Sequence, residues 1–324
     1  MKKLISVILA IVLIASSILA FSACGENKTD GEINVATLNG TTGFGMAQLM
    51  KESSLGNTSN KYNFSVESDP SVVMAGLING NIDIAALPTN AAANVYSKTN
   101  GNVQIIAINT LGVLYVLTNG VEINSISDLE GKTIYCPSQN PTFITKYIIK
   151  ENNLENKVTI DSTTYATPDA LRTAVIAGQV EIAVLPEPMV TIVKANNSNI
   201  KVALDLTSEW NKVSDGKQLV QGCVVVRKEF ADQYPGSVNE FLKDYEESIN
   251  YINENPANGA SYIKEFNIFA NENVAKNAIP KCNIAYMDGD EMKEAMDNFL
   301  KAMYSVAPAS IGNAIPGDDF YYGA

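Results

Sequence analysis

The chain is a succession of short, largely apolar runs separated by longer stretches in which apolar residues recur with helical spacing. The runs 33–38, 84–88, 132–136 and 182–186 are five or six residues long and are stopped by Asn or Pro, which is typical of buried strands. Because such strands alternate with helices, we expect a mainly parallel sheet with helices on both faces. The predicted fold class is therefore α/β.

Residues 69–88 and 167–186 are two copies of one pattern, because seven of their 20 positions are identical at a constant offset of 98. In each copy, Asp69 or Thr167 is placed to cap a helix that opens with Pro. A glycine in each copy then ends the helix, and a strand that stops at Pro follows. These matched units predict two similar lobes, each a mainly parallel sheet with helices on both faces.

Two further apolar strands, residues 113–118 and 222–227, follow the fourth strand of each half and are expected to join the lobes as a hinge. Hinged lobes can close over a ligand. The expected organisation is discontinuous. Residues 32–115 and 225–324 form the first lobe, which includes the C-terminal helices, and residues 116–224 form the second.

Residues 235–304 show helical spacing, and these helices have no sheet of their own, so we expect them to pack on one of the lobes. Ser237 and Glu240 have the spacing of a capping box at the first of these helices. The acidic run 288–291 lacks the ligand spacing of a calcium loop and is better interpreted as the N-cap of the last helix. No metal site is predicted.

The first 23 residues have the pattern of an export signal. A short cationic start precedes residues 4–21, an unbroken run of apolar and small residues. With Cys24 after Ala23, the segment resembles a bacterial lipoprotein signal, which implies cleavage before Cys24 and lipidation of its thiol. Residues 24–31 then form a tether, and the protein is anchored to the cell membrane outside the cytoplasm. The alternative is an uncleaved membrane helix, although a run of 18 residues is at the short end of a span.

Composition excludes several classes of function. The chain has no histidine, which rules out Ser-His-Asp and Cys-His catalysis and histidine metal ligands. Its net charge of −12 provides no basic surface for nucleic acid. Cys136, Cys223 and Cys282 lie far apart without CxxC spacing, so we expect buried free thiols, with one disulfide as the alternative. No cofactor is predicted.

Four segments resemble the bacterial solute-binding proteins of ABC importers, of the periplasmic-binding-protein type II class. They are residues 76–92 (GLINGNIDIAALPTNAA), 127–134 (SDLEGKTI), 185–195 (LPEPMVTIVKA) and 310–322 (SIGNAIPGDDFYY), and the likeness extends over residues 31–324. The nearest group takes nitrate, sulfonates, taurine or a pyrimidine precursor of thiamine. The resemblance implies a monomeric, non-enzymatic receptor that captures a small solute between its lobes and delivers it to a membrane permease.

One departure and two alternatives accompany this resemblance. The loop 136–142 (CPSQNPT) lacks the Gly and Ser common in the group, which favours a different ligand. An exported binding component of a sensor is one alternative. The other is an enzyme on the same fold, such as the cytoplasmic menaquinone-pathway lyases or the pyrimidine synthase that consumes its own histidine. The missing histidine excludes that synthase, and the export signal argues against both enzymes.

Candidate ligand contacts lie at the carboxyl ends of the predicted strands, where open parallel sheets bind ligands. Several precede helix N-termini, whose free N–H groups favour anions and polar oxygens. Aromatic rings among them can stack on a flat solute. Helix capping and turn formation are the alternatives for each Ser, Thr or Asn, and a core position is the alternative for Phe44. The predicted contacts are Asn39, Thr41, Thr42, Phe44, Asp69, Thr89, Asn90, Asn109, Ser138, Gln139, Asn140, Thr142, Tyr165 and Glu187.

Glu187 is the most specific of these candidates. It stands between Pro186 and Pro188 at a strand end, at the position that Thr89 holds in the first half. A carboxylate there accepts a hydrogen bond from an amino group or a cation and repels a small oxyanion. A solvated loop charge is the alternative. Arg172, one of only two arginines, is expected to be a surface charge. We therefore rank a flat heteroaromatic vitamin precursor above a sulfonate or other organic anion, and nitrate last.

Overall fold

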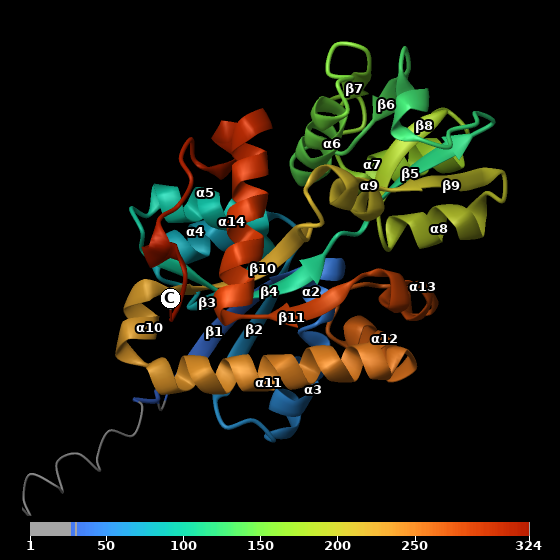
Figure 1. Ribbon diagram of the computed structural model, residues 1–324. Coiled ribbons are helices and arrows are strands. Elements are labelled where there is room, and N and C mark those ends of the chain that lie inside the picture. Colours follow the sequence, from blue (N-terminus) through green and yellow to red (C-terminus); the bar gives the residue numbers. More distant parts are fainter. Residues whose placement is uncertain (1–26, 30, 324) are drawn as a thin grey trace, which may run out of the picture.

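The computed structural model describes residues 27–29 and 31–323, so the predicted signal peptide and the lipidation site at Cys24 lie outside the described residues. Two sheets lie in separate lobes, which are joined near the middle of the molecule (Figure 1). Most strands of each sheet run in one direction, and helices cover both faces. The predicted α/β class with two similar lobes is confirmed.

The first lobe contains a sheet of six strands. In spatial order they are β11 (Ile284–Met287), β4 (Val103–Leu111), β10 (Val220–Arg227), β3 (Ile84–Pro88), β1 (Glu32–Leu38) and β2 (Lys61–Glu67). β1 is parallel to β2 and β3. β10 lies between β3 and β4 and is antiparallel to both, and β11 is antiparallel to β4.

The second lobe repeats this arrangement with five strands. In spatial order they are β7 (Thr159–Asp161), β6 (Thr133–Tyr135), β8 (Ile182–Pro186), β5 (Leu114–Asn119) and β9 (Ile200–Asp205). β6 is parallel to β7 and β8, and β5 lies between β8 and β9, antiparallel to both. In each lobe, the inserted antiparallel strand is the first that the chain forms after crossing from the other lobe.

The helices cover the sheets on both faces, and none of those among the described residues is long and apolar enough to cross a membrane. The α-helices are α2 (Thr41–Phe44), α3 (Ala47–Leu55), α4 (Pro70–Asn79), α5 (Thr89–Lys98), α6 (Asn140–Glu151), α7 (Pro168–Ile176), α8 (Met189–Asn196), α9 (Leu206–Val213), α10 (Lys228–Gln233), α11 (Pro235–Glu254), α12 (Pro256–Glu265), α13 (Glu272–Ala278) and α14 (Gly289–Val306). Short 3-10 helices are η1 (Ile126–Leu129), η2 (Ile279–Lys281), η3 (Pro308–Ile311) and η4 (Asp318–Phe320).

The repeated unit is formed as its sequence predicts. The carboxylate of Asp69 accepts the backbone N–H of Ser71 at 2.8 Å, and the hydroxyl of Thr167 accepts that of Ala170 at 3.2 Å. Each residue therefore satisfies one of the N–H groups that a helix leaves unpaired at its start. Gly80 follows α4 in the left-handed conformation, with φ of 76°, which a glycine adopts without steric cost.

The hinge differs from the expectation in where the chain crosses. The strands expected to span the lobes are each hydrogen-bonded into a single sheet, β5 in the second lobe and β10 in the first. The chain crosses in the short segments just before them, at 112–113 and 214–219. The reason is that a buried strand must pair its backbone groups on both sides, which an isolated connection between lobes cannot do.

The capping box expected at Ser237 and Glu240 is wrong. α11 begins at Pro235, whose fixed φ suits the first helical position. The Ser237 hydroxyl instead accepts the backbone N–H of Thr29, at 3.0 Å, and Glu240 pairs with Lys28 at 2.8 Å. Both side chains therefore hold the N-terminal segment against the first lobe.

α14 belongs to both lobes. It packs on β4, β10 and α5 of the first lobe and on α6 of the second. The ring of Trp210, on α9, lies 6.0 Å from that of Phe299 on α14 and 4.7 Å from that of Tyr147 on α6. One hydrophobic core runs through both lobes at this side. Motion between the lobes must therefore leave this side packed.

Two expectations about single residues are also confirmed. Cys136, Cys223 and Cys282 are free and buried. Arg172 forms an ion pair with Asp169 one helical turn away, at 2.6 Å, on the surface of the second lobe. Neither group takes part in a site described below.

Candidate functional site

The loops after β3, β6 and β8 meet at the junction between the lobes. The backbone N–H of Glu187, just after β8, donates to the carbonyl oxygen of Val113 in the outgoing crossing, at 3.0 Å. Nδ2 of Asn140, the first residue of α6, donates to the hydroxyl of Thr89, the first residue of α5, at 3.5 Å. Three predicted site residues therefore come to one junction from three separate loops.

Thr89 and Asn140, which are in contact, and Asn90, which follows Thr89 in the chain, are buried at this junction, and we call these three residues the polar seam. The exposed fractions of Thr89, Asn90 and Asn140 are 0%, 4% and 6%. Oδ1 of Asn90 and Oδ1 of Asn140 have no hydrogen-bond partner among the described residues. Buried polar atoms in folded proteins are nearly always paired, and the exceptions call for an explanation. Two unpaired amide oxygens at one interlobe junction are such an exception.

The loops that lead into α2 and α6 share an unusual backbone. Gly40 precedes α2 with φ of 87° and ψ of −158°, and Gln139 precedes α6 with φ of 70° and ψ of −138°. Glycine adopts this conformation freely, but for Gln139 it is strained. Strain of this kind is found preferentially at functional sites. Gln139 is exposed and lies beside the polar seam in the chain.

Several predicted contacts use their polar groups within the protein. Nδ2 of Asn109 donates to the hydroxyl of Tyr245 and to the carbonyl of Thr42, at 3.0 and 3.1 Å, and its Oδ1 accepts a hydrogen bond from the next residue. The hydroxyls of Ser138 and Thr142 donate to backbone carbonyls of their own lobe. These bonds agree with the turn and capping interpretation of the same residues.

Phe44 is a correction. Its ring is fully buried in the first lobe, in edge-to-face contact with Phe269 at 6.0 Å, so it offers no face to a solute. The ring lies on the buried side of α2, where the apolar face of the helix packs on the sheet. Tyr165 is half-buried, and its ring lies 5.7 Å from that of Tyr135.

Three predicted contacts keep accessible surface in the first lobe. Asn39 is exposed, and Thr41 and Thr42 are half-buried in the first turn of α2. Ligand contact by these three residues, and by Tyr165, stays a prediction.

Glu187 is buried, with only 2% of its surface exposed, so the alternative of a solvated loop charge is wrong. Its Oε2 accepts the backbone N–H of Thr191 at 3.0 Å, in the first turn of α8. The residue lines a groove of about 540 Å³ between the lobes, which we call the Glu187 groove. The lining residues are Tyr115, Glu187, Val190, Thr191, Lys194, Ala195 and Val202 of the second lobe and Asn277 and Lys281 of the first.

The electrostatics of the groove follow from this burial. Burial raises the pKa of the Glu187 carboxyl, while the hydrogen bond from the Thr191 backbone N–H and the charge of Lys281 act in the opposite direction. Burial, followed by the charges of Asp205 and Glu187, raises the pKa of Tyr115 to about 12. The groove therefore places a carboxylate, a neutral phenol and two ammonium groups around one volume.

Sequence reasoning missed most of this lining. Thr191 and Lys194 lie on α8, four and seven residues after Glu187, so the helix expected after Pro188 is the signal that could have found both. Asn277 and Lys281 come from the α13–η2 segment of the other lobe, far away in the chain. Only the packing of α13 against α8 brings them to the groove.

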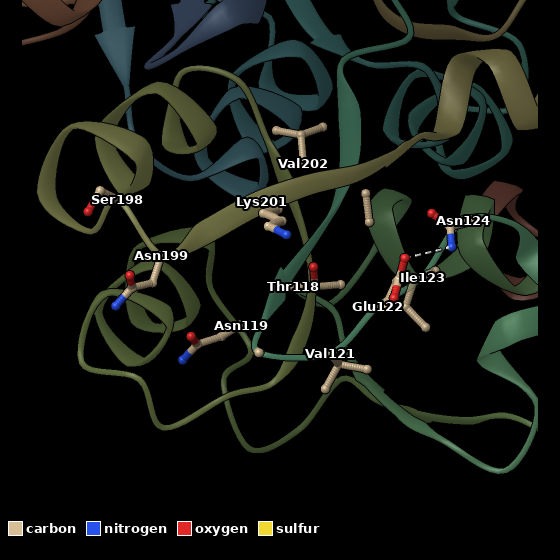
Figure 2. A pocket seen from close by; sticks show the side chains of 12 residues that line it. Thr118, Asn119, Val121, Glu122, Ile123, Asn124, Ser198, Asn199, Lys201 and Val202 are labelled. Carbon is tan, nitrogen blue, oxygen red and sulfur yellow. Dashed lines mark hydrogen bonds between the residues drawn. The ribbon is translucent and has the colours of Figure 1, made fainter.

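A larger hollow of about 830 Å³ lies along β5 and β9 of the second lobe (Figure 2), and Val202 lines both this hollow and the Glu187 groove. It is lined by the end of β5, the loop that follows it, and the start of β9, with Asn119, Asn124 and Lys201 among its polar side chains. Leu114 pairs with Pro186 and Thr118 with Ile182, so the far end of β5 lies farther along the strand from Glu187. No residue of the first lobe lines it, and we therefore do not place the ligand there.

Within residues 27–29 and 31–323, no group of three or more Cys, Asp or Glu side chains is arranged to hold a metal ion. What the junction offers is hydrogen bonding and charge.

The solved structures that the chain resembles share its fold. A structure described as an ABC transporter from Parabacteroides distasonis has a TM-score of 0.75 and 22% identity, over 90% of this chain and 99% of that chain. The periplasmic aliphatic sulphonate binding protein SsuA from Escherichia coli has a TM-score of 0.72 and 11% identity, over 90% and 91%. A Candida albicans protein, described as having the generic periplasmic binding protein fold, has a TM-score of 0.54 and 14% identity, over 90% and 93%. The chain is therefore a protein of the periplasmic-binding-protein fold, as predicted.

The family comes from a sequence comparison. A family model described as menaquinone biosynthesis matches residues 46–305, and the chain belongs to this family. A search of curated proteins found no match. Because one fold can host both receptors and enzymes, function has to be argued from the site.

Proposed function

We propose that this protein is an extracytoplasmic receptor that captures a small solute between its two lobes and delivers it to the permease of an ABC importer. The observation that carries the proposal is the junction itself, where Thr89, Asn140 and Glu187 are presented from both lobes by loops that start helices. A solute bound there contacts both lobes at once, and its binding energy then favours the closed arrangement. The fold shared with sulfonate-binding SsuA supports this proposal.

The expected attachment follows from the N-terminal sequence. The lipoprotein-like segment before Cys24 supports a receptor anchored to the outer side of the cell membrane by lipid, acting as a monomer beside its permease. Cleavage before Cys24 removes Lys2 and Lys3 and makes the mature protein still more acidic. The strong negative charge disfavours nucleic acid as a partner.

The Glu187 groove supports a preference for solutes with amino or other donor groups. A buried carboxylate accepts hydrogen bonds and repels small oxyanions, while Lys194 and Lys281 at the same groove accommodate one negative group. A flat heteroaromatic solute thus ranks first, an organic anion such as a sulfonate second and nitrate last.

The proposal is tested on the protein purified without its first 23 residues. Native mass spectrometry of gently purified protein identifies any solute that it carries, and calorimetry then measures the affinity for that compound. Small-angle scattering should show a smaller radius of gyration with the solute than without it. Absence of any bound or binding solute, together with an unchanged radius of gyration, contradicts the receptor function.

A second candidate is an enzyme, and the family match favours it. Without histidine, a general base has to be another group, and Glu187 is the best placed because burial raises the pKa of its carboxyl. The two candidates differ in the fate of the solute. A receptor returns it unchanged after prolonged incubation, whereas an enzyme converts it. Chromatography of the recovered solute therefore decides between them, with the Glu187→Gln variant as the control for turnover.

A further inference from the structure

The polar seam contains two buried amide oxygens that no donor of the described residues reaches. Oδ1 of Asn90 and Oδ1 of Asn140 are buried, and neither has a partner within the described part of the chain. An unpaired buried acceptor bears the full cost of its desolvation. The two side chains come from opposite lobes, one in the first turn of α5 and one in the first turn of α6.

The orientation of the Asn140 amide is determined by its neighbour. The Thr89 hydroxyl donates its proton to the carbonyl oxygen of Val220, at 3.0 Å. It can then only accept from Asn140, so the group of Asn140 that faces it at 3.5 Å is the NH₂. Oδ1 is consequently the end that has no partner. The contact is at the long limit for a hydrogen bond, so little holds the two lobes together at this point.

We propose that the polar seam recognises the N–H or O–H donors of a neutral solute, specifically the N–H–C=O edge of a cyclic amide or ureide. The two Asn oxygens supply acceptors, and the N-terminal N–H groups of α5 and α6 supply donors beside them. A cyclic amide edge offers a donor next to an acceptor and matches both. The inference rests on the proposed function and names its solute class.

The same seam discriminates against acceptor-only anions. Nitrate and an ionised sulfonate have no hydrogen to offer, so either could accept from the N-terminal N–H groups of α5 and α6 but would leave both Asn oxygens unpaired. Thr89, Asn90 and Asn140 are uncharged and provide no compensating cation. Entry of a solute requires the lobes to part at the Asn140–Thr89 contact, and the bound solute then bridges them. The polar-seam residues that bind the solute are therefore also the residues through which the solute holds the two lobes together.

The test compares probes and variants by thermal shift and calorimetry on the whole exported chain. The probes are uracil and hypoxanthine, which have amide edges, 1,3-dimethyluracil, in which both N–H groups are methylated, and nitrate and methanesulfonate as acceptor-only anions. We expect uracil or hypoxanthine to raise the unfolding temperature and the other three to leave it unchanged. Asn90→Leu and Asn140→Leu should each weaken the binding at least tenfold.

A matched variant separates ligand recognition from structural support. Asn109 is equally buried, but both ends of its amide are paired, so Asn109→Leu should lower the unfolding temperature of the solute-free protein. Asn90→Leu should leave that temperature unchanged or raise it, because it removes an unpaired oxygen. The proposal is overturned if Asn90→Leu and Asn140→Leu lower the unfolding temperature of the solute-free protein as much as Asn109→Leu does. It is also overturned if neither uracil nor hypoxanthine raises the unfolding temperature. A rise in the unfolding temperature with nitrate or methanesulfonate alone also overturns the proposal, but it is consistent with the receptor function.

Discussion

At the residue scale, the site is defined by how completely each polar group is paired. Asn109 and Asn140 are the same residue type at similar burial, yet the first has both ends of its amide bonded and the second has an oxygen that no described residue reaches. Glu187 lies between these cases, because its carboxylate accepts one backbone N–H and still lines an interlobe groove. Unpaired hydrogen-bonding groups therefore distinguish the candidate site residues, and residue type alone does not.

Glu187→Gln should weaken solute binding while keeping the side chain's size. Loss of a hydrogen bond between the ligand and a charged group costs about 1.5–3 kcal/mol, which is about ten- to 150-fold in affinity. Isothermal titration calorimetry with the solute recovered from the purified protein measures the change. An unchanged dissociation constant removes Glu187 from the site, and Arg172→Gln, which lies away from the groove, serves as the charge-removal control.

The same variant should change how stability depends on pH. Because burial raises the pKa of Glu187 above its ordinary value of 4.5, the folded protein binds this proton more tightly than the unfolded chain. Stability should thus fall as the pH rises from 4.5 through the raised pKa, and the Glu187→Gln protein should lack this component. Unfolding temperatures of the two proteins, measured from about pH 4 to about pH 7, should converge at the acidic end. A constant difference across the range contradicts the raised pKa.

At the element scale, the two lobes use one βα unit with different caps. Asp69 starts α4 and Thr167 starts α7 at matching places, each followed by Pro. The hydrogen bonds from Ser71 hold the pKa of the Asp69 carboxyl below its usual value, whereas a threonine cap has no charge to lose. The two caps therefore respond differently to acid.

Asp69→Ala and Thr167→Ala should both destabilise the protein at neutral pH. Thr167→Ala should cost about 1 kcal/mol, the usual value of a lost cap, at every pH. The effect of Asp69→Ala should shrink as the pH falls through the lowered pKa of the aspartate, because the wild-type carboxyl is then protonated. Urea unfolding at several pH values measures both. Solute affinity that drops with Asp69→Ala at constant stability contradicts a purely capping role.

At the scale of the whole molecule, the lobes are joined by two tight crossings and by a shared core. Gly112, in the outgoing crossing, lies against α9, where an added Cβ would be 2.2 Å from Oγ1 and 3.0 Å from Cβ of Thr207. At the other end of the junction, α14 packs between the lobes around Phe299 and Trp210. The junction therefore has closely packed elements on one side and unpaired polar groups at the seam.

Gly112→Ala should destabilise the protein by about 1–3 kcal/mol, because the crossing has no room for a methyl group. Thr207→Ala in the same chain should restore part of the loss, since it removes the closest atom. Urea unfolding of the two single variants and the double variant gives their coupling. Gly31→Ala, whose new Cβ would meet only Thr29 at 3.4 Å, is the control. If the losses of unfolding free energy in the two single variants simply add in the double variant, the steric explanation is wrong.

Phe299→Ala should cost about 3–5 kcal/mol and separate the unfolding of the two lobes. The ring is fully buried in the core that runs through both lobes, so its removal opens a cavity where they are joined. Differential scanning calorimetry should show one transition for the wild type and two for the variant. Tyr304→Ala, on the exposed side of the same helix, should change little. A single transition in Phe299→Ala protein contradicts the coupling of the lobes through α14.

Local sequence patterns alone were sufficient to predict the fold class and the two-lobed organisation of this protein. The spacing of apolar residues, the caps at Asp69 and Thr167, and the repeated strand that stops at Pro depend on contacts within about twenty residues, and they predicted the α/β class and the two similar lobes. The same local rules placed the candidate contacts at strand ends. They failed where two local explanations compete, as at Ser237, because Pro235 starts the helix first.

Tertiary structure decided what those candidates do. The burial of Phe44, the pairing of Asn109, the contact of Asn140 with Thr89 and the arrival of Lys281 at the groove of Glu187 all join segments that are far apart in the chain. Burial and hydrogen-bond pairing are set by neighbours from other elements, and no sequence window contains them. The sequence therefore placed the candidate contacts at strand ends, and only the packing of the two lobes determined which polar atoms of the described residues have no partner among them.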